Sequence, residues 1–123
     1  MRRQITYTSL IWLLFVGACT MSVAPRPGAA DLFDSQSYDR LLEASAAIEQ
    51  AKASFAAGKL PADSKALINA AISSYNVAQA GWHTYHDAHG AMGRDMLAAD
   101  IAKLTAAVAE IFRKNAPAPV LIP

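Results

Sequence analysis

The chain has 123 residues and a formal net charge of +1, and 54% of its residues are hydrophobic although only 8% are aromatic. This length is enough for one small domain, and a hydrophobic content supplied largely by alanine favours helices over sheets. The nearly neutral charge excludes the broad positive surface that nucleic-acid binding requires, so no nucleic-acid partner is expected.

The first 19 residues have the features of an export signal. A short basic start precedes the apolar run of residues 10–18, which is about half the length needed to span a bilayer. The run ends in the sequence VGAC at residues 16–19, which resembles the lipobox of bacterial lipoprotein precursors. The resemblance implies that the bond between Ala18 and Cys19 is cut and that Cys19, the single cysteine of the chain, carries a lipid.

Such a protein is held in the bacterial envelope by its lipid. An aspartate after the cysteine resembles an inner-membrane retention mark, so Thr20 favours the outer membrane, with the protein facing the periplasm. Loss of residues 1–18, which contain two arginines and no acidic residue, changes the formal charge from +1 to −1. Two other interpretations stay open: Cys19 is an ordinary apolar residue of an uncleaved signal anchor, or cleavage occurs at the small residues 28–30.

The remaining sequence divides into a tether, a helical domain and a tail. Residues 19–33 are expected to form the lipidated cysteine and a flexible tether, because prolines and a glycine interrupt any apolar periodicity. Residues 34–116 are expected to form the folded domain, and residues 117–123 a proline-rich extended tail.

Three apolar seams, each with alternating steps of three and four residues, predict three helices. The expected helices run from an N-cap at Asp34 or Ser35 to Gly58, from Pro61–Ser64 to Gly90, and from Gly93 to the residue before Pro117. Their seams are Leu41, Ala44, Ile48, Ala51 and Phe55; Ile68, Ala71, Tyr75, Ala78, Trp82, Tyr85 and His89; and Leu97, Ile101, Leu104, Val108 and Ile111. Because the connections are short, the predicted fold is an all-α, antiparallel three-helix bundle with up-down-up topology.

Small side chains form a stripe opposite the bulky seam of the second helix. The stripe comprises Ala70, Ser74, Val77, Gly81, Thr84 and Ala88, and the third helix carries Ala99, Ala102, Ala106 and Ala109 in a matching place. Small residues at heptad spacing let helices approach closely. The stripe through Ala70, Ser74, Val77 and Gly81, or the apolar tail residues 120–122, is therefore a candidate contact face for an envelope protein or a second copy. Packing within the bundle and an unpartnered helical surface remain alternatives.

Three histidines recur near the end of the second helix. His83, His86 and His89, together with Asp87, are candidate metal ligands because residues three or four apart share a helical face. Successive steps of three residues rotate by about 60° each, so three rings do not easily meet one ion. Histidines at a helix C-terminus also interact favourably with the helix dipole, which is the competing interpretation.

The sequence offers no catalytic signature. It lacks a glycine-rich phosphate loop, a covalent haem motif and a credible pairing of nucleophile and base. We therefore expect a non-enzymatic helical module without a cofactor that acts by protein contact or assembly, a class that includes phage-derived envelope lipoproteins. The alternative is a lipoprotein that binds a metal or small ligand through the histidines.

Overall fold

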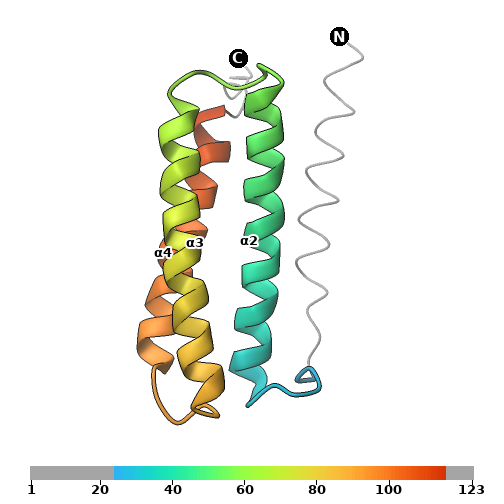
Figure 1. Cartoon of the computed structure of the whole chain (residues 1–123), viewed down its shortest axis with the longest axis vertical. Helices are drawn as coiled ribbons and strands as arrows, with labels where there is room; N and C mark the ends of the chain where they lie inside the picture. The colour runs from blue at the N-terminus through green and yellow to red at the C-terminus, as the bar shows by residue number, and fades with distance from the viewer. Residues whose placement is uncertain (1–23, 116–123) are drawn as a thin grey trace, which may run out of the picture.

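The computed structural model describes residues 24–115, which form three long helices (Figure 1). The helices are α2 (Leu32–Ala56), α3 (Ser64–Asp87) and α4 (Arg94–Asn115). Each helix packs against both others in an up-down-up arrangement, with the largest contact between α3 and α4. The prediction of an all-α three-helix bundle is therefore confirmed. The predicted signal peptide, Cys19 and the tail lie outside the described residues.

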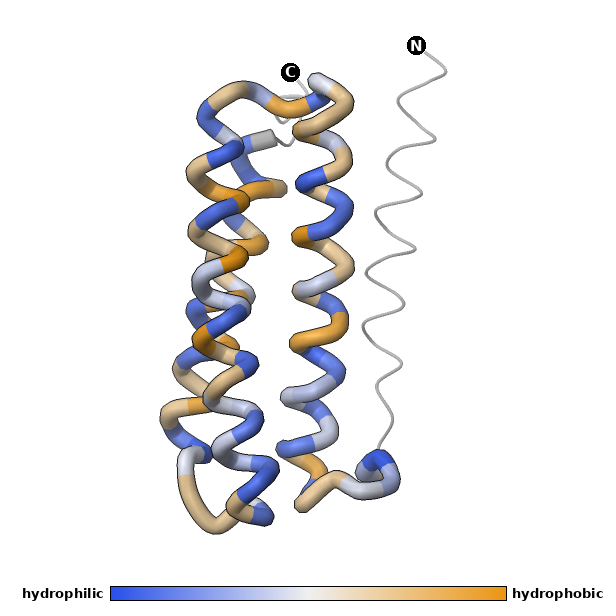
Figure 2. The backbone as a smooth tube through the Cα atoms, in the orientation of Figure 1, coloured by the Kyte–Doolittle hydropathy of each residue, from blue (hydrophilic) through white to orange (hydrophobic). Residues whose placement is uncertain are grey.

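The predicted seams form the core. Hydrophobic and hydrophilic positions alternate along all three helices (Figure 2). The buried apolar residues are Leu41, Ala44, Ile48 and Ala51 of α2, Ile68, Ala71, Ala78 and Tyr85 of α3, and Leu97, Leu104 and Ile111 of α4. Phe55, Tyr75, Trp82, Ile101 and Val108 are half-buried at its edge. The prediction that His89 belongs to the buried seam is wrong: His89 is exposed, because α3 ends before it.

The start of α2 differs from the expectation. Its N-cap is Asp31, not Asp34 or Ser35, and the Asp31 carboxylate accepts the backbone N–H of Asp34 at 2.8 Å. The Asp34 carboxylate accepts the backbone N–H of Ala30, the residue before the N-cap, so the two aspartates fix the helix start and the segment that precedes it. The Asp34 side chain is buried in the bundle.

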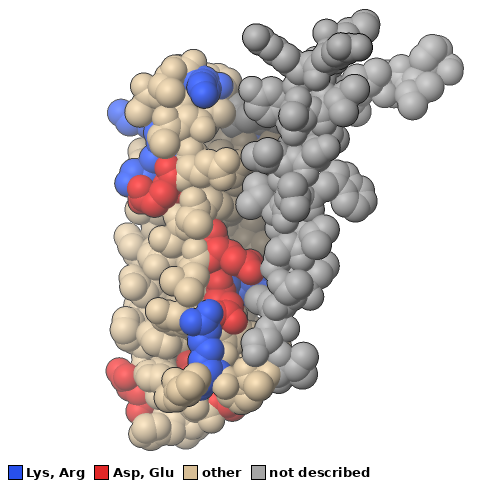
Figure 3. Space-filling view, turned by 90° about the vertical axis from the view of Figure 1, so that its right-hand side faces the viewer, with Lys and Arg blue, Asp and Glu red and all other residues tan. Residues whose placement is uncertain are grey.

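The lengths of the helices and the charges on the surface describe the outside of the bundle. Within residues 24–115, no helix is both long and apolar enough to cross a bilayer. On the face shown in Figure 3, acidic and basic side chains lie beside each other and are separated by uncharged areas. That face does not present a continuous surface of one charge.

Candidate functional site

The segment that precedes α2 is fixed to the end of the bundle where α2 begins and α3 ends (Figure 1). The backbone N–H of Arg26 donates to Ser35 Oγ at 3.0 Å, and that of Ala30 donates to Asp34 Oδ2 at 2.7 Å. The Arg26 guanidinium pairs with the carboxylate of Asp39. Residues 26–30, which the sequence placed in the flexible tether, are thus bound to the helix that they precede.

Asp34 is the centre of this end of the bundle. Its side chain is buried at 1% exposure, and three donors reach its carboxylate from two parts of the chain. Trp82 Nε1 lies 2.6 Å from Oδ1, while His86 Nδ1 and the Ala30 N–H each lie 2.7 Å from Oδ2. A buried carboxylate is costly unless its oxygens accept hydrogen bonds, and here they do. Asp34 therefore joins the N-terminal segment, α2 and α3.

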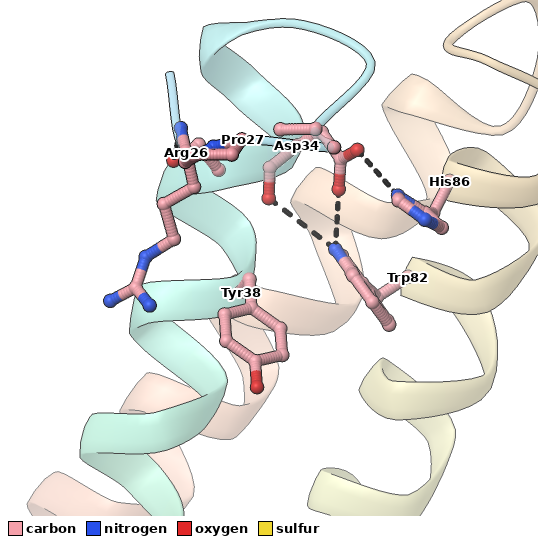
Figure 4. Close-up of a pocket in the computed structure, with 9 residues that line it drawn as sticks. Arg26, Pro27, Asp34, Tyr38, Trp82 and His86 are labelled. Atoms are coloured by element: carbon pink, nitrogen blue, oxygen red, sulfur yellow. Dashed lines mark hydrogen bonds and ion pairs between the residues drawn. The ribbon is translucent and has the colours of Figure 1, made fainter. Parts of the chain in front are cut away.

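Aromatic rings surround this polar contact. Figure 4 shows Trp82 and His86 reaching from α3 toward Asp34, with Tyr38 projecting from α2 beside the indole. The Trp82 and His86 rings stack with centroids 4.8 Å apart, and the Tyr38 and Trp82 centroids are 5.2 Å apart. Arg26 lies 5.4 Å from the centre of the Tyr38 ring. Aromatic packing thus extends from the core between the helices to Arg26 of the N-terminal segment.

An open pocket of about 400 Å³ lies between the N-terminal segment and these rings. Its walls include Arg26, Pro27, Asp34, Tyr38, Trp82 and His86 (Figure 4). His86 Nδ1 and Asp34 Oδ2 share a hydrogen bond, in which Nδ1 is the donor when the carboxylate is ionised. The His86 side chain is 35% exposed, so part of its ring is open to solvent. The pocket walls therefore carry an imidazole and a phenol, while the Arg26 guanidinium is engaged by Asp39.

A second polar contact lies at the same end of the bundle. The hydroxyl of Tyr85, a side chain that is 1% exposed, donates to the Asp31 carboxylate. This bond, followed by the Asp34 N–H and the charge of Arg94, holds the pKa of Asp31 below its ordinary value of 3.8 against the opposing effect of burial. The same bond raises the pKa of Tyr85, and burial adds to that effect. The phenol therefore stays protonated and the carboxylate ionised over a wide pH range.

The predicted histidine cluster is spread over the surface. His83, Asp87 and His89 are exposed, and only His86 is turned to a carboxylate. Within residues 24–115, no group of three or more histidine, cysteine, aspartate or glutamate side chains is placed to hold one metal ion. Of the four candidate ligands, His86 is thus the one that contacts Asp34 and lines the pocket.

The predicted small-residue stripe is divided between two environments. Ala70 and Val77 are exposed, Val77 at 55%, whereas Ser74 and Gly81 are half-buried. A Cβ atom on Gly81 would lie 3.1 Å from Asp100 Oδ2 and 3.7 Å from Leu97 Cδ1, both on α4. Gly81 therefore serves the close approach of α3 and α4. The matching alanines of α4, at 99, 102, 106 and 109, are all exposed.

Sequence reasoning missed the roles of the two aspartates. The sequence predicts a helix cap at Asp34 and a place in the apolar seam for Trp82, and their separation by 48 positions along the chain hides their contact. One signal was available: Asp31 and Asp34 stand three residues apart just before an apolar seam, a spacing typical of reciprocal helix capping. Comparisons of this chain with protein-family models, curated proteins and solved structures find no match.

Proposed function

We propose that this chain is a small lipid-anchored protein of the bacterial envelope, and that its bundle acts by contact with another protein and not by catalysis. The proposal takes its anchor from the VGAC sequence that ends in Cys19. The structural observation that supports it most is the fixing of residues 26–30 on Asp34 and Ser35. Few residues then separate the lipid from the folded body, so the bundle is presented at the membrane surface.

The anchor is tested by metabolic labelling with a palmitate analogue. The wild-type chain should be labelled and should fractionate with the outer membrane, whereas Cys19→Ala should lose the label and leave an uncleaved or secreted product. Cleavage at residues 28–30, the competing interpretation, would remove Cys19 and give an unlabelled mature chain. Undiminished labelling of Cys19→Ala would contradict the proposal.

The contact face is proposed to lie on the outer surfaces of α3 and α4. Val77 and Ala70 of α3 and the four alanines of α4 are exposed, so a partner helix could approach the backbone closely there. Gly81→Leu is a poor test of this face, because the new side chain would collide first with Asp100 of the same chain. Val77 is the better probe.

Photo-cross-linking in the native envelope tests the contact. A photoreactive amino acid at Val77 or Ala106 should capture one defined protein or a second copy, and the same group at the exposed Gln50 of α2 should not. The variants must retain full helical circular dichroism. Capture of nothing at positions 77 and 106, or of the same products at all three positions, would contradict the proposed contact face.

Binding of a metal or small ligand is the second candidate function, and the pocket beside His86 favours it. A histidine that donates Nδ1–H to a carboxylate resembles the outer support of many metal-bound histidines. Zinc and copper titrations of the purified chain test this candidate. Affinity in the micromolar range that is lost in His86→Gln and kept in the exposed control His83→Gln would favour ligand binding over protein contact.

A further inference from the structure

Two methionines stand exposed at the end of the bundle that carries the N-terminal segment. We propose that this end of the bundle rests on the phospholipid surface, with Met92 and Met96 entering the headgroup region of the bilayer. The inference deepens the proposed function and rests on it, because it takes the lipid to be on Cys19.

Exposure singles out these two side chains. Met92 is 63% exposed and Met96 68%, the highest values among the exposed large apolar residues of the described chain. Met92 lies two residues before α4 and Met96 lies in its first turn, and Leu32 at the start of α2 is exposed at the same end of the bundle. An unbranched thioether side chain adapts to irregular apolar surroundings, and such side chains enter the boundary between headgroups and acyl chains.

The length of chain outside the structure decides which end meets the lipid. Arg26 is held on the bundle through Ser35 and Asp39, and Cys19 lies seven residues before it. Seven residues span at most about 25 Å when fully extended. The 25 residues of α2 alone are about 37 Å long, so the opposite end of an upright bundle lies a further helix length from the anchor.

Charges beside the methionines favour an apolar contact over an electrostatic one. The Arg94 guanidinium lies 4.3 Å from the centre of the Phe33 ring and attracts the nearby Asp31 carboxylate. The exposed Asp95 adjoins it in sequence, so both signs of charge border the two methionines. Contact with a neutral phosphatidylethanolamine surface is therefore expected, with little dependence on salt.

Fluorescence in vesicles tests this orientation. The full chain is produced and processed in a bacterium with an environment-sensitive fluorescent amino acid at position 96, then purified and reconstituted in phosphatidylethanolamine–phosphatidylcholine vesicles. Phe112, an apolar residue of α4 near the other end of the bundle and 43% exposed, is the matched control position. The emission at position 96 should shift to shorter wavelength and be quenched by lipid-borne spin labels, in both 0.1 and 0.5 M NaCl (about 10 and 4 Å screening lengths). The emission at position 112 should do neither.

Each other outcome overturns the inference. Water-like emission at position 96 means that the methionines do not meet lipid, and equal quenching at positions 96 and 112 means that the bundle does not stand on this end. The intact mass of the same sample reports whether Cys19 is acylated. An acylated chain with water-like emission at position 96 would overturn the inference and leave the proposed function intact, whereas a chain without acyl mass would overturn the proposed function itself.

Discussion

At the scale of single residues, Asp31 and Asp34 hold together the end of the bundle that carries the N-terminal segment. Asp31 closes the first turn of α2 and accepts the hydroxyl proton of Tyr85. Asp34 accepts from Trp82 and His86 of α3. Each carboxylate thus stabilises both the start of α2 and the contact between α2 and α3. Substitution of its partners, although they lie near the end of α3, should therefore lower the free energy of unfolding.

Tyr85→Phe should lower the free energy of unfolding by about 1.5 kcal/mol, because a hydrogen bond to a charged group is lost while the buried ring stays in place. Urea denaturation measures the change. Tyr38→Phe is the matched control, since Tyr38 is 36% exposed, and it should change stability by less than about 0.5 kcal/mol. Equal effects of the two substitutions would show that the Asp31 contact contributes no stability.

The same bond predicts how stability depends on pH. The folded pKa of Asp31 lies below 3.8, so its contribution is fully present above pH 3.8 and is lost as the pH falls through the folded value. The folded pKa of Tyr85 lies above 10.0, so its contribution is present below pH 10.0 and is lost as the pH rises through that folded value. Urea midpoints measured from pH 2 to pH 7 (a range that brackets the ordinary carboxyl pKa) should fall less in Asp31→Asn than in the wild-type chain. Parallel curves for the two chains would contradict this assignment.

At the scale of helices, the ends of α2 and α3 use the same C-terminal motif with different residues. Beyond α2, Gly58 has φ 72° and donates to the carbonyl of Phe55, while Lys59 donates to that of Ser54. Beyond α3, His89 has φ 53° and donates to the carbonyl of His86, while Gly90 donates to that of Tyr85. His89 therefore occupies the left-handed position that glycine normally takes.

His89→Gly should raise the free energy of unfolding by about 1 kcal/mol, because glycine adopts this conformation without strain from a Cβ atom. Gly58→Ala should lower it by a similar amount. Thermal and urea unfolding of the two variants, compared with the wild-type chain, measure both changes. Destabilisation by His89→Gly would mean that the imidazole makes a contact worth more than the strain.

Asp34→Asn should release the N-terminal segment from α2, since the amide replaces one accepting oxygen with a donor that faces other donors. The Ala30 amide proton should exchange with solvent about tenfold faster, which corresponds to the loss of one hydrogen bond. Hydrogen exchange followed by NMR measures this rate. Asp63→Asn, at the start of α3 and the other end of the bundle, should leave the exchange of Ala30 unchanged. Unchanged exchange in Asp34→Asn would mean that Asp34 does not hold the N-terminal segment.

The helices were predictable and the contacts at their ends were not. The steps of three and four residues between Leu41, Ala44 and Ile48 predict a helix with one buried face, because a helix buried on one side repeats its apolar residues with that period. The same periodicity also predicts that the seam of α3 includes His89, which lies two residues past the end of the helix. Periodicity alone does not detect the turn that ends the helix there. The link from Asp34 to Trp82 and His86 arises from tertiary packing, which no local pattern encodes.

At the scale of the whole molecule, the bundle has two different ends. One end binds the N-terminal segment and carries Met92 and Met96, and the other bears the loop from α2 to α3 (Figure 1). The flexible tether expected over residues 19–33 is shortened by the contacts of residues 26–30 with α2. A lipid on Cys19 would then hold the bundle close to the membrane and limit the partners it can reach to those near that surface.

Intact mass spectrometry of the protein extracted from the envelope determines whether the chain is anchored through Cys19. A lipid anchor gives a chain that begins at Cys19 and carries the added mass of a diacylglycerol and an acyl chain, and Cys19→Ala should lack this form. A mature chain that begins after residues 28–30, or an unprocessed chain with a free thiol at Cys19, would mean that the protein is not anchored in this way.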